Sequence, residues 1–300
     1  MELWIFLSIA AALFQTLRFM LQKQLSQTEL TATGATLARF LYSAPLVVVA
    51  AFIYLNVTGR EFTMPAGNFW LYGALGGAAQ VLATICTVKT FAYRNFAVGV
   101  TFKKTEVFLT ALIGFILFGE SVSAFGVLAM TIGFAGVIVL SGAINRETHW
   151  RASLTSPATV LGLSAGALFG VSAVNYRAAS LLIESGDPFE RALITLGAVT
   201  SMQLLGMLGW LMWRDRAEIG RVLSVWRTAG FVGLTSIGGS FCWFTAFTLQ
   251  NAAYVKAVGQ IELIFSILAS VLFFREKITG REFLGIGLIS LSVIAMVVWV

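Results

Sequence analysis

The sequence predicts an all-α integral membrane protein with ten transmembrane helices, arranged as two inverted five-helix repeats. Three observations lead to this fold class: an apolar composition, a series of apolar runs of membrane-spanning length, and an internal repeat. Of the 300 residues, 58% are hydrophobic and only 11% are charged. A soluble domain of this size could not bury so much apolar surface, so lipid must cover most of it.

Ten apolar runs are long enough to cross a bilayer, which takes about 20 helical residues. They lie at about 3–22, 31–55, 68–91, 97–118, 122–143, 157–177, 189–213, 228–249, 253–274 and 281–299. We therefore expect an N-terminal five-helix repeat at 1–143, a polar linker at 144–156 and a C-terminal five-helix repeat at 157–300. The first run follows Glu2 and lacks the basic start of a signal peptide, so we expect a retained helix.

The internal repeat relates residues 70–140 to residues 226–296 by a shift of 156 positions without a gap. Glu106, for example, falls on Glu262. A unit with five spans leaves the chain on the opposite side of the membrane, so the second copy must be inserted upside down. The repeat therefore predicts an approximate two-fold axis in the membrane plane. In proteins of this design the substrate site lies near the midplane between the repeats.

Small residues at helical spacing predict close helix packing. Gly73 and Gly77 form one GxxxG pattern, and Gly162, Gly166 and Gly170 form two that overlap. In lipid, such residues let helix backbones approach one another. We interpret these patterns as packing signals rather than as parts of a site.

Charged and polar residues inside the expected helices are the candidates for function, because they are expensive in a bilayer. The candidate substrate-binding or proton-coupling residues are Arg18, Arg39, Lys103, Lys104, Glu106, Trp243, Gln260 and Glu262.

Glu106 and Glu262 are the most informative pair. Each lies about nine residues into its helix, which is roughly 13 Å into a hydrocarbon core about 30 Å thick. Because the copies enter from opposite sides, both carboxylates should lie near the midplane at nearly the same height. They could bind a substrate ammonium or carry a coupling proton. Alternatively, each could be neutralised by a nearby lysine, such as Lys103 three residues before Glu106.

The cations leave two interpretations open. Lys103, Lys104 and Lys256 lie nearer to the helix ends, so they either face the site or extend to the lipid headgroups. Arg18, near the end of the first helix, either reaches the interface or clamps a carboxylate with two hydrogen bonds. Arg39 lies as deep as the glutamates, so an interfacial position explains it less well.

The remaining candidates depend on their repeat positions. Lys104 and Gln260 are repeat mates, which suggests a polar ring around a cavity. Trp243 could line a pocket or could simply pack against other helices. Glu120 and Glu276 end the helices at 97–118 and 253–274, and this position favours a structural role.

Several function classes lose support. The sequence contains no P-loop and no metal-ligand cluster, its single histidine (His149) lies in the linker, and no nucleophile–base set stands out. We therefore expect no cofactor, no metal site and no enzymatic activity. The net charge of +6 lies largely in short loops, so membrane orientation and lipid headgroups explain it better than a nucleic-acid partner. The loop charges favour both termini outside the cell.

This plan of ten helices in two copies, with Glu120 and Glu276 closing the fourth helix of each half, resembles the EamA-type carriers of the drug/metabolite transporter superfamily. The resemblance covers the whole chain. It implies a secondary transporter, often an exporter, with a central cavity and with both termini in the cytoplasm. Many relatives carry proline at the positions of Glu106 and Glu262, and glycine at the position of Arg275.

Together these features predict a secondary active transporter in the cell inner membrane, an exporter that works by alternating access. Its partners would be the lipid bilayer and a small charged or zwitterionic metabolite, with amino acids as the leading candidates and protons as a possible coupling ion. One alternative is a multidrug or organic-cation antiporter that exchanges protons at Glu106 or Glu262. Another is an exchanger of organic anions or phosphate esters that uses the lysines and arginines.

Overall fold

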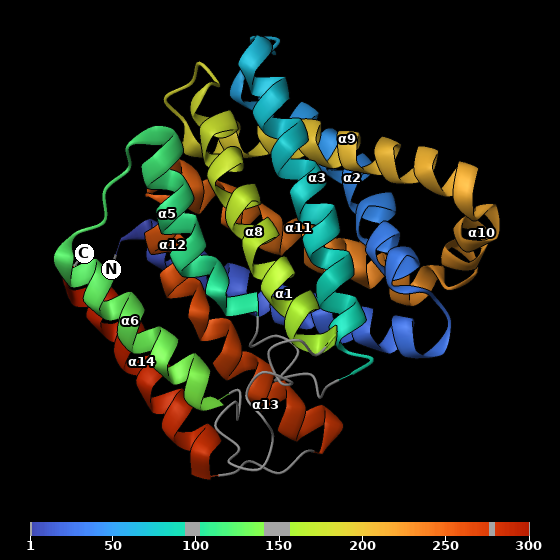
Figure 1. The fold of residues 1–300 in the computed structure, drawn as a ribbon. Coiled ribbons are helices and arrows are strands. Elements are labelled where there is room, and N and C mark those ends of the chain that lie inside the picture. Colours follow the sequence, from blue (N-terminus) through green and yellow to red (C-terminus); the bar gives the residue numbers. More distant parts are fainter. Residues whose placement is uncertain (1, 94–102, 141–156, 276–279, 300) are drawn as a thin grey trace.

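The computed structural model describes residues 2–93, 103–140, 157–275 and 280–299, and every regular element in these ranges is a helix (Figure 1). The first half contains α1 (Leu3–Thr28), α2 (Ala32–Thr58), α3 (Gly67–Thr90), the 3₁₀ turn η1 (Lys103–Thr105), α5 (Glu106–Phe118) and α6 (Ala124–Leu140). The second half contains α8 (Pro157–Leu181), α9 (Pro188–Arg214), α10 (Arg216–Ser224), α11 (Trp226–Leu249), α12 (Ala252–Val258), the 3₁₀ turn η2 (Gly259–Ile261), α13 (Glu262–Phe274) and α14 (Gly280–Trp299). The predicted all-α class is confirmed.

The described helices are those of a multi-pass membrane protein. Seven helical stretches are long and apolar enough to cross a membrane, and two shorter apolar helices lie at Ala124–Gly136 and Phe283–Met296. The outer surface is rich in large apolar side chains: Phe52, Leu272 and Phe283 are 69%, 72% and 76% exposed. Such side chains fit a surface covered by lipid rather than by water. The total of ten spans stays a prediction.

Helix boundaries recur with the same shift of 156 residues that relates the two sequence copies. The shift carries α2 onto α9 and α5 onto α13 at both ends, and it carries the start of α6 onto the start of α14. Even the N-caps correspond, since Thr31 caps α2 and Asp187 caps α9 with a side-chain oxygen. The repeat therefore extends further towards the N-terminus than residue similarity alone revealed.

Helices of the two halves pack against each other in corresponding pairs. The main pairs are α3 with α8, α1 with α11, α2 with α9, and α6 with α14. The shift exchanges the first two pairs with each other and maps each of the other two onto itself. This is the contact pattern of an approximate two-fold axis. Figure 1 shows α6 and α14 side by side at one edge, with α2 and α9 on the other side of the molecule. That this axis lies in the membrane plane stays a prediction.

One element differs from the sequence-based expectation. The polar stretch Arg214–Arg227, which separates the expected helices at 189–213 and 228–249, contains the short amphipathic helix α10. Its buried face carries Glu218 and Val222. One carboxylate oxygen of Glu218 accepts hydrogen bonds from the backbone nitrogen and the hydroxyl of Thr31, at 2.8 and 2.6 Å. A carboxylate is favoured at this place because it faces the N-terminus of α2. The expected linker at 144–156 lies outside the described residues.

Candidate functional site

Two 3₁₀ turns at equivalent positions form the framework of the site. The turns η1 and η2 come directly before Glu106 and Glu262. A 3₁₀ turn interrupts the regular helical bonding and leaves backbone groups available to other partners. At η2, the carbonyl of Gly259 accepts a hydrogen bond from Lys104 Nζ at 3.2 Å. A lysine of the first copy thus stabilises the 3₁₀ turn η2 of the second copy.

Gly166 on α8 lets that helix approach the 3₁₀ turn η1. A Cβ atom at this position would lie 2.3 Å from Thr105 Oγ1 and 2.9 Å from the carbonyl oxygen of Lys103. Any larger residue would therefore push η1 away from α8. The structure confirms the packing role expected for this glycine and shows that it helps to position the site.

Glu262 is completely buried and tightly held. Its two oxygens lie 2.8 Å from Lys103 Nζ and 2.5 Å from Lys104 Nζ. The side-chain amide of Gln15 donates a further hydrogen bond of 2.9 Å. Two lysines of the first copy therefore balance the carboxylate of the second copy.

Glu106 is also buried, but its contacts are longer. Lys256 Nζ lies 3.5 Å from one of its oxygens and Lys104 Nζ lies 3.8 Å from the other. The pairing of Glu106 with Lys103, proposed as an alternative from their spacing, is wrong because Lys103 pairs with Glu262. The lysines do neutralise the glutamates, but mainly across the two copies.

The interfacial interpretation of the remaining cations is also wrong. Lys256 is 5% exposed and Arg18 is 4% exposed, so neither side chain extends to the headgroups. The ammonium of Lys256 instead lies 4.5 Å from the ring centre of Trp243, and the ammonium of Lys103 lies 4.4 Å from that of Phe19. Aromatic faces attract such cations when water is excluded.

Two buried arginines have no carboxylate partner within the described ranges. Arg39 donates hydrogen bonds to the hydroxyls of Thr84 and Ser240, at 3.4 and 3.0 Å. Arg18 stacks near the ring of Phe19 at 4.5 Å. Its Nε and one terminal nitrogen are buried without a hydrogen-bond partner in the described part of the chain.

These side chains form what we call the central charge cluster: Arg18, Arg39, Lys103, Lys104, Lys256, Glu106 and Glu262. In their ordinary charge states they comprise five cations and two carboxylates, an excess of three positive charges. Every member is less than a tenth exposed. Buried charges in proteins are normally paired, since desolvation of an unpaired charge is costly. The cluster is therefore suited to an anionic ligand.

A small cavity adjoins the cluster. Its volume of about 10 Å³ leaves room for about one water molecule. Lys256, Trp243, Gln15 and Ser240 are among its lining residues, so Trp243 does line a pocket. The indole Nε1 of Trp243 donates a 3.1 Å hydrogen bond to Gln15 Oε1. The site is closed in this conformation, since a metabolite would need more space.

The structure differs from the sequence-based prediction at two glutamines, Gln260 and Gln15. Gln260 is buried, but it packs near Gly133 and Ser292, between α6 and α14, and does not line this cavity. Lys104 does not line the cavity either, so the polar ring expected from Lys104 and Gln260 does not surround it. Gln15 was missed, although its spacing of three residues from Arg18 places both on one face of α1.

Glu120 has the structural role expected from its position. It accepts a hydrogen bond from Arg177 Nε on α8. The guanidinium of Arg177 also donates to the backbone oxygen of Gln250 at 2.7 Å, after the end of α11. This arrangement ties α5 to α8 and α11. Its repeat mate Glu276 lies outside the described residues.

Comparisons with known proteins agree with this architecture. Residues 157–298 match the EamA-like transporter family. The multidrug resistance protein EbrB of Bacillus atrophaeus is 29% identical over 99 residues, which are 32% of this chain and 85% of that protein. A solved structure described as "Crystal structure of protein" superposes on this chain with a TM-score of 0.62 and 16% sequence identity. The superposition covers 97% of this chain and 99% of the solved chain.

At 16% identity the solved structure supports the fold alone. The family match covers the second half of the chain and indicates a membrane transporter rather than an enzyme. These findings agree with the resemblance to EamA-type carriers: residues 157–298 match the EamA-like transporter family, and the chain is a multi-pass membrane protein.

Proposed function

We propose that this protein is a secondary active transporter of a small metabolite that bears an anionic group. The observation that carries the proposal is the excess of positive charge in the central charge cluster. Arg18 is the best-placed recognition residue, because two of its nitrogens are buried without a partner among the described residues. A guanidinium in this state would bind a carboxylate with two parallel hydrogen bonds.

Amino acids remain the leading candidates within this class. The longer contacts of Glu106, at 3.5 and 3.8 Å, leave its oxygens free to turn towards a substrate ammonium. Arg18 and Glu106 would then bind the carboxylate and the ammonium of one zwitterion. An organic acid or phosphate ester, which has no ammonium, is the second candidate because the cationic excess favours it equally.

A multidrug function finds less support in the site. The relative EbrB is named as a multidrug resistance protein. In this chain, however, a lipophilic cation would meet five buried cations and two carboxylates that already contact lysines. Electrostatic repulsion therefore opposes a cationic substrate.

Alternating access would use the 3₁₀ turns η1 and η2 as hinges. In transporters built from inverted repeats, discontinuous helices mark substrate sites, and 3₁₀ turns often mark hinges. Because the cavity is small, the two halves must separate before a metabolite can bind. When the substrate anion takes over a lysine contact, Glu106 would lose its partner and could accept a proton. We propose outward transport across the cell inner membrane.

The test is uptake into proteoliposomes that contain the purified protein, with and without a pH gradient. The labelled panel comprises neutral and acidic amino acids, dicarboxylates, a phosphorylated metabolite and a lipophilic cation. We expect saturable uptake of at least one compound that bears a carboxylate, and reduced uptake by Arg18→Gln. Uptake of the lipophilic cation alone would contradict the proposal. No uptake above empty liposomes by folded protein would also contradict it.

A further inference from the structure

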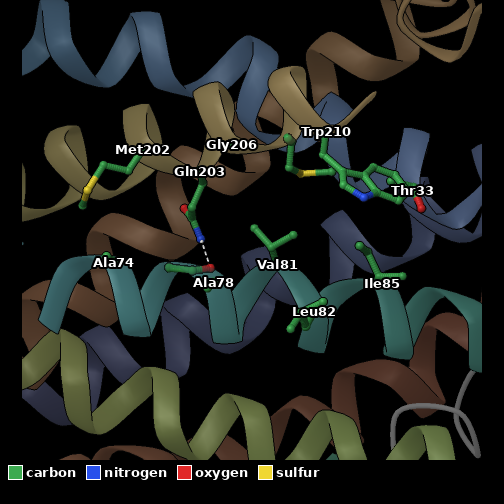
Figure 2. Close-up of a pocket in the computed structure, with 12 residues that line it drawn as sticks. Thr33, Ala74, Ala78, Val81, Leu82, Ile85, Met202, Gln203, Gly206 and Trp210 are labelled. Carbon is green, nitrogen blue, oxygen red and sulfur yellow. Dashed lines mark hydrogen bonds between the residues drawn. The ribbon is translucent and has the colours of Figure 1, made fainter. Parts of the chain in front are cut away.

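A second cavity lies along the surface of α3 and α9, and none of its lining residues belongs to the central charge cluster. This groove has a volume of about 480 Å³, and Thr33 in the first turn of α2 lines one end of it (Figure 2). Its lining is apolar except for Thr33 and Gln203: Ala74, Gly77, Ala78, Val81, Leu82, Ile85, Met202, Gly206, Met207 and Trp210 complete the set. Both α3 and α9 are long enough to cross a membrane. Leu82 and Trp210 in its lining are 52% and 49% exposed, so the groove opens on the outer surface that lipid would cover.

The length of the groove matches one leaflet of a bilayer. From Ala74 to Ile85 the lining follows α3 for eleven residues, or about 17 Å at 1.5 Å per residue. One leaflet contributes about half of a hydrocarbon core roughly 30 Å thick. An acyl chain that enters from one membrane surface would thus fill the groove to its inner end.

Cations follow the groove at its outer end. Figure 2 shows Ile85, Trp210 and Thr33 at the same end. One helical turn beyond Ile85 stands Lys89, and one turn beyond Trp210 stands Arg214. Both cations lie in the last turns of their helices, both are exposed, and no ion pair within the described ranges joins either of them. Tryptophan at such a position is typical of the headgroup level.

We propose that this groove is a binding site for an anionic phospholipid. One acyl chain lies along α3 and α9, and the phosphate of the headgroup lies against Lys89 and Arg214. Two cations without an acidic partner favour a lipid with net negative charge over a zwitterionic one. The groove and the two cations are separate from the residues proposed to bind the transported substrate.

The headgroup is tested by native mass spectrometry of the purified protein with phosphatidylglycerol or phosphatidylcholine of the same chain length. We expect tighter binding of phosphatidylglycerol by the unchanged protein. The double variant Lys89→Gln/Arg214→Gln should lose about fivefold in this preference for each cation removed. Arg281→Gln is the matched control, since Arg281 is exposed on α14, on the far side of the molecule from α9 (Figure 1). Equal binding of the two lipids, or an unchanged preference in the double variant, would overturn the proposal.

The acyl chain is tested by filling the groove. Gly206 lines it, and a Cβ atom there would meet no other atom within 4 Å, so Gly206→Leu should fold normally. Gly209→Leu is the control, because Gly209 has the same free space on α9 but does not line the groove. We expect weaker binding of phosphatidylglycerol only in Gly206→Leu. Equal effects of both substitutions, or full competition by inorganic phosphate, would show that no acyl chain occupies the groove.

Discussion

The helices α5 and α13 both begin at a glutamate but hold that glutamate differently. In each copy a three-residue 3₁₀ turn precedes the glutamate, which begins a helix of 13 residues. Glu262 has three donors within 2.9 Å. Glu106 has two ammonium groups at 3.5 and 3.8 Å. The difference arises because the first copy has Lys103 and Lys104 where the second has Gly259 and Gln260.

This comparison separates two roles that the repeat alone would make equivalent. The fold places each carboxylate directly after a 3₁₀ turn, but the contacts with Lys103 and Lys104 make Glu262 a fixed structural group. Glu106, with longer contacts, is the carboxylate that can change partners at low cost. In this protein the internal symmetry belongs to the backbone, whereas the asymmetry needed for recognition comes from side chains.

The largest expected effect comes from Glu262→Gln. This change leaves Lys103 and Lys104 buried without their carboxylate, and removal of one partner from a buried ion pair costs about 3–5 kcal/mol. Glu106→Gln should lower the free energy of unfolding by clearly less. Thermal unfolding in detergent, followed by tryptophan fluorescence, measures both. The double variant Lys103→Gln/Glu262→Gln should recover part of the loss. Equal losses in the two single variants would remove the distinction between the copies.

Arg18→Gln should affect transport rather than stability. The change removes a buried cation that has no acidic partner in the described structure, so the melting temperature should stay the same or rise. The KM for the best carboxylate substrate should increase about tenfold or more, because charge-assisted hydrogen bonds to the substrate are lost. A loss of stability comparable to that of Glu262→Gln would instead assign a structural role to Arg18.

A smaller difference is expected at the ends of α5 and α13. Gly119 and its repeat mate Arg275 both have positive φ angles, 65° and 53°. Glycine adopts this conformation freely, whereas other residues pay about 1–2 kcal/mol. Gly119→Ala should therefore destabilise the protein by about 1 kcal/mol, and Arg275→Gly should be neutral or stabilising. Thermal unfolding of both variants tests this, and stabilisation by Gly119→Ala would contradict it.

The smallest effect concerns the two N-caps, Thr31 and Asp187. Burial raises the pKa of Asp187, but hydrogen bonds from Tyr54, the Phe189 backbone and Arg60 outweigh it, so the pKa is below its ordinary value. A carboxyl with a lowered folded-state pKa stabilises the protein above its unfolded value, about pH 3.9. This contribution is lost as the pH falls through the folded-state pKa. The unfolding free energy of Asp187→Asn should show less dependence on pH between 5 and 3, whereas Thr31→Ser should leave the profile unchanged.

The membrane helices and their repetition can be read from the sequence alone. Apolar runs of about 20 residues predict membrane helices because lipid leaves no alternative for the backbone. The shift of 156 residues predicted equivalent positions for Glu106 and Glu262, and the structure places a 3₁₀ turn before each of them. These properties are local or periodic, so they can be read along one chain.

The ion-pair partners of the buried charges depend on the tertiary structure. Lys103 lies three residues from Glu106 but binds Glu262, which is 159 residues away. Sequence spacing places a side chain on a helix face, but only the packing of the two halves determines what that face meets. The same packing buries Arg18 and Lys256, which have stems long enough to reach the interface. The packing also stabilises α10, the short helix before α11, because Glu218 on α10 accepts hydrogen bonds from Thr31 at the N-terminus of α2.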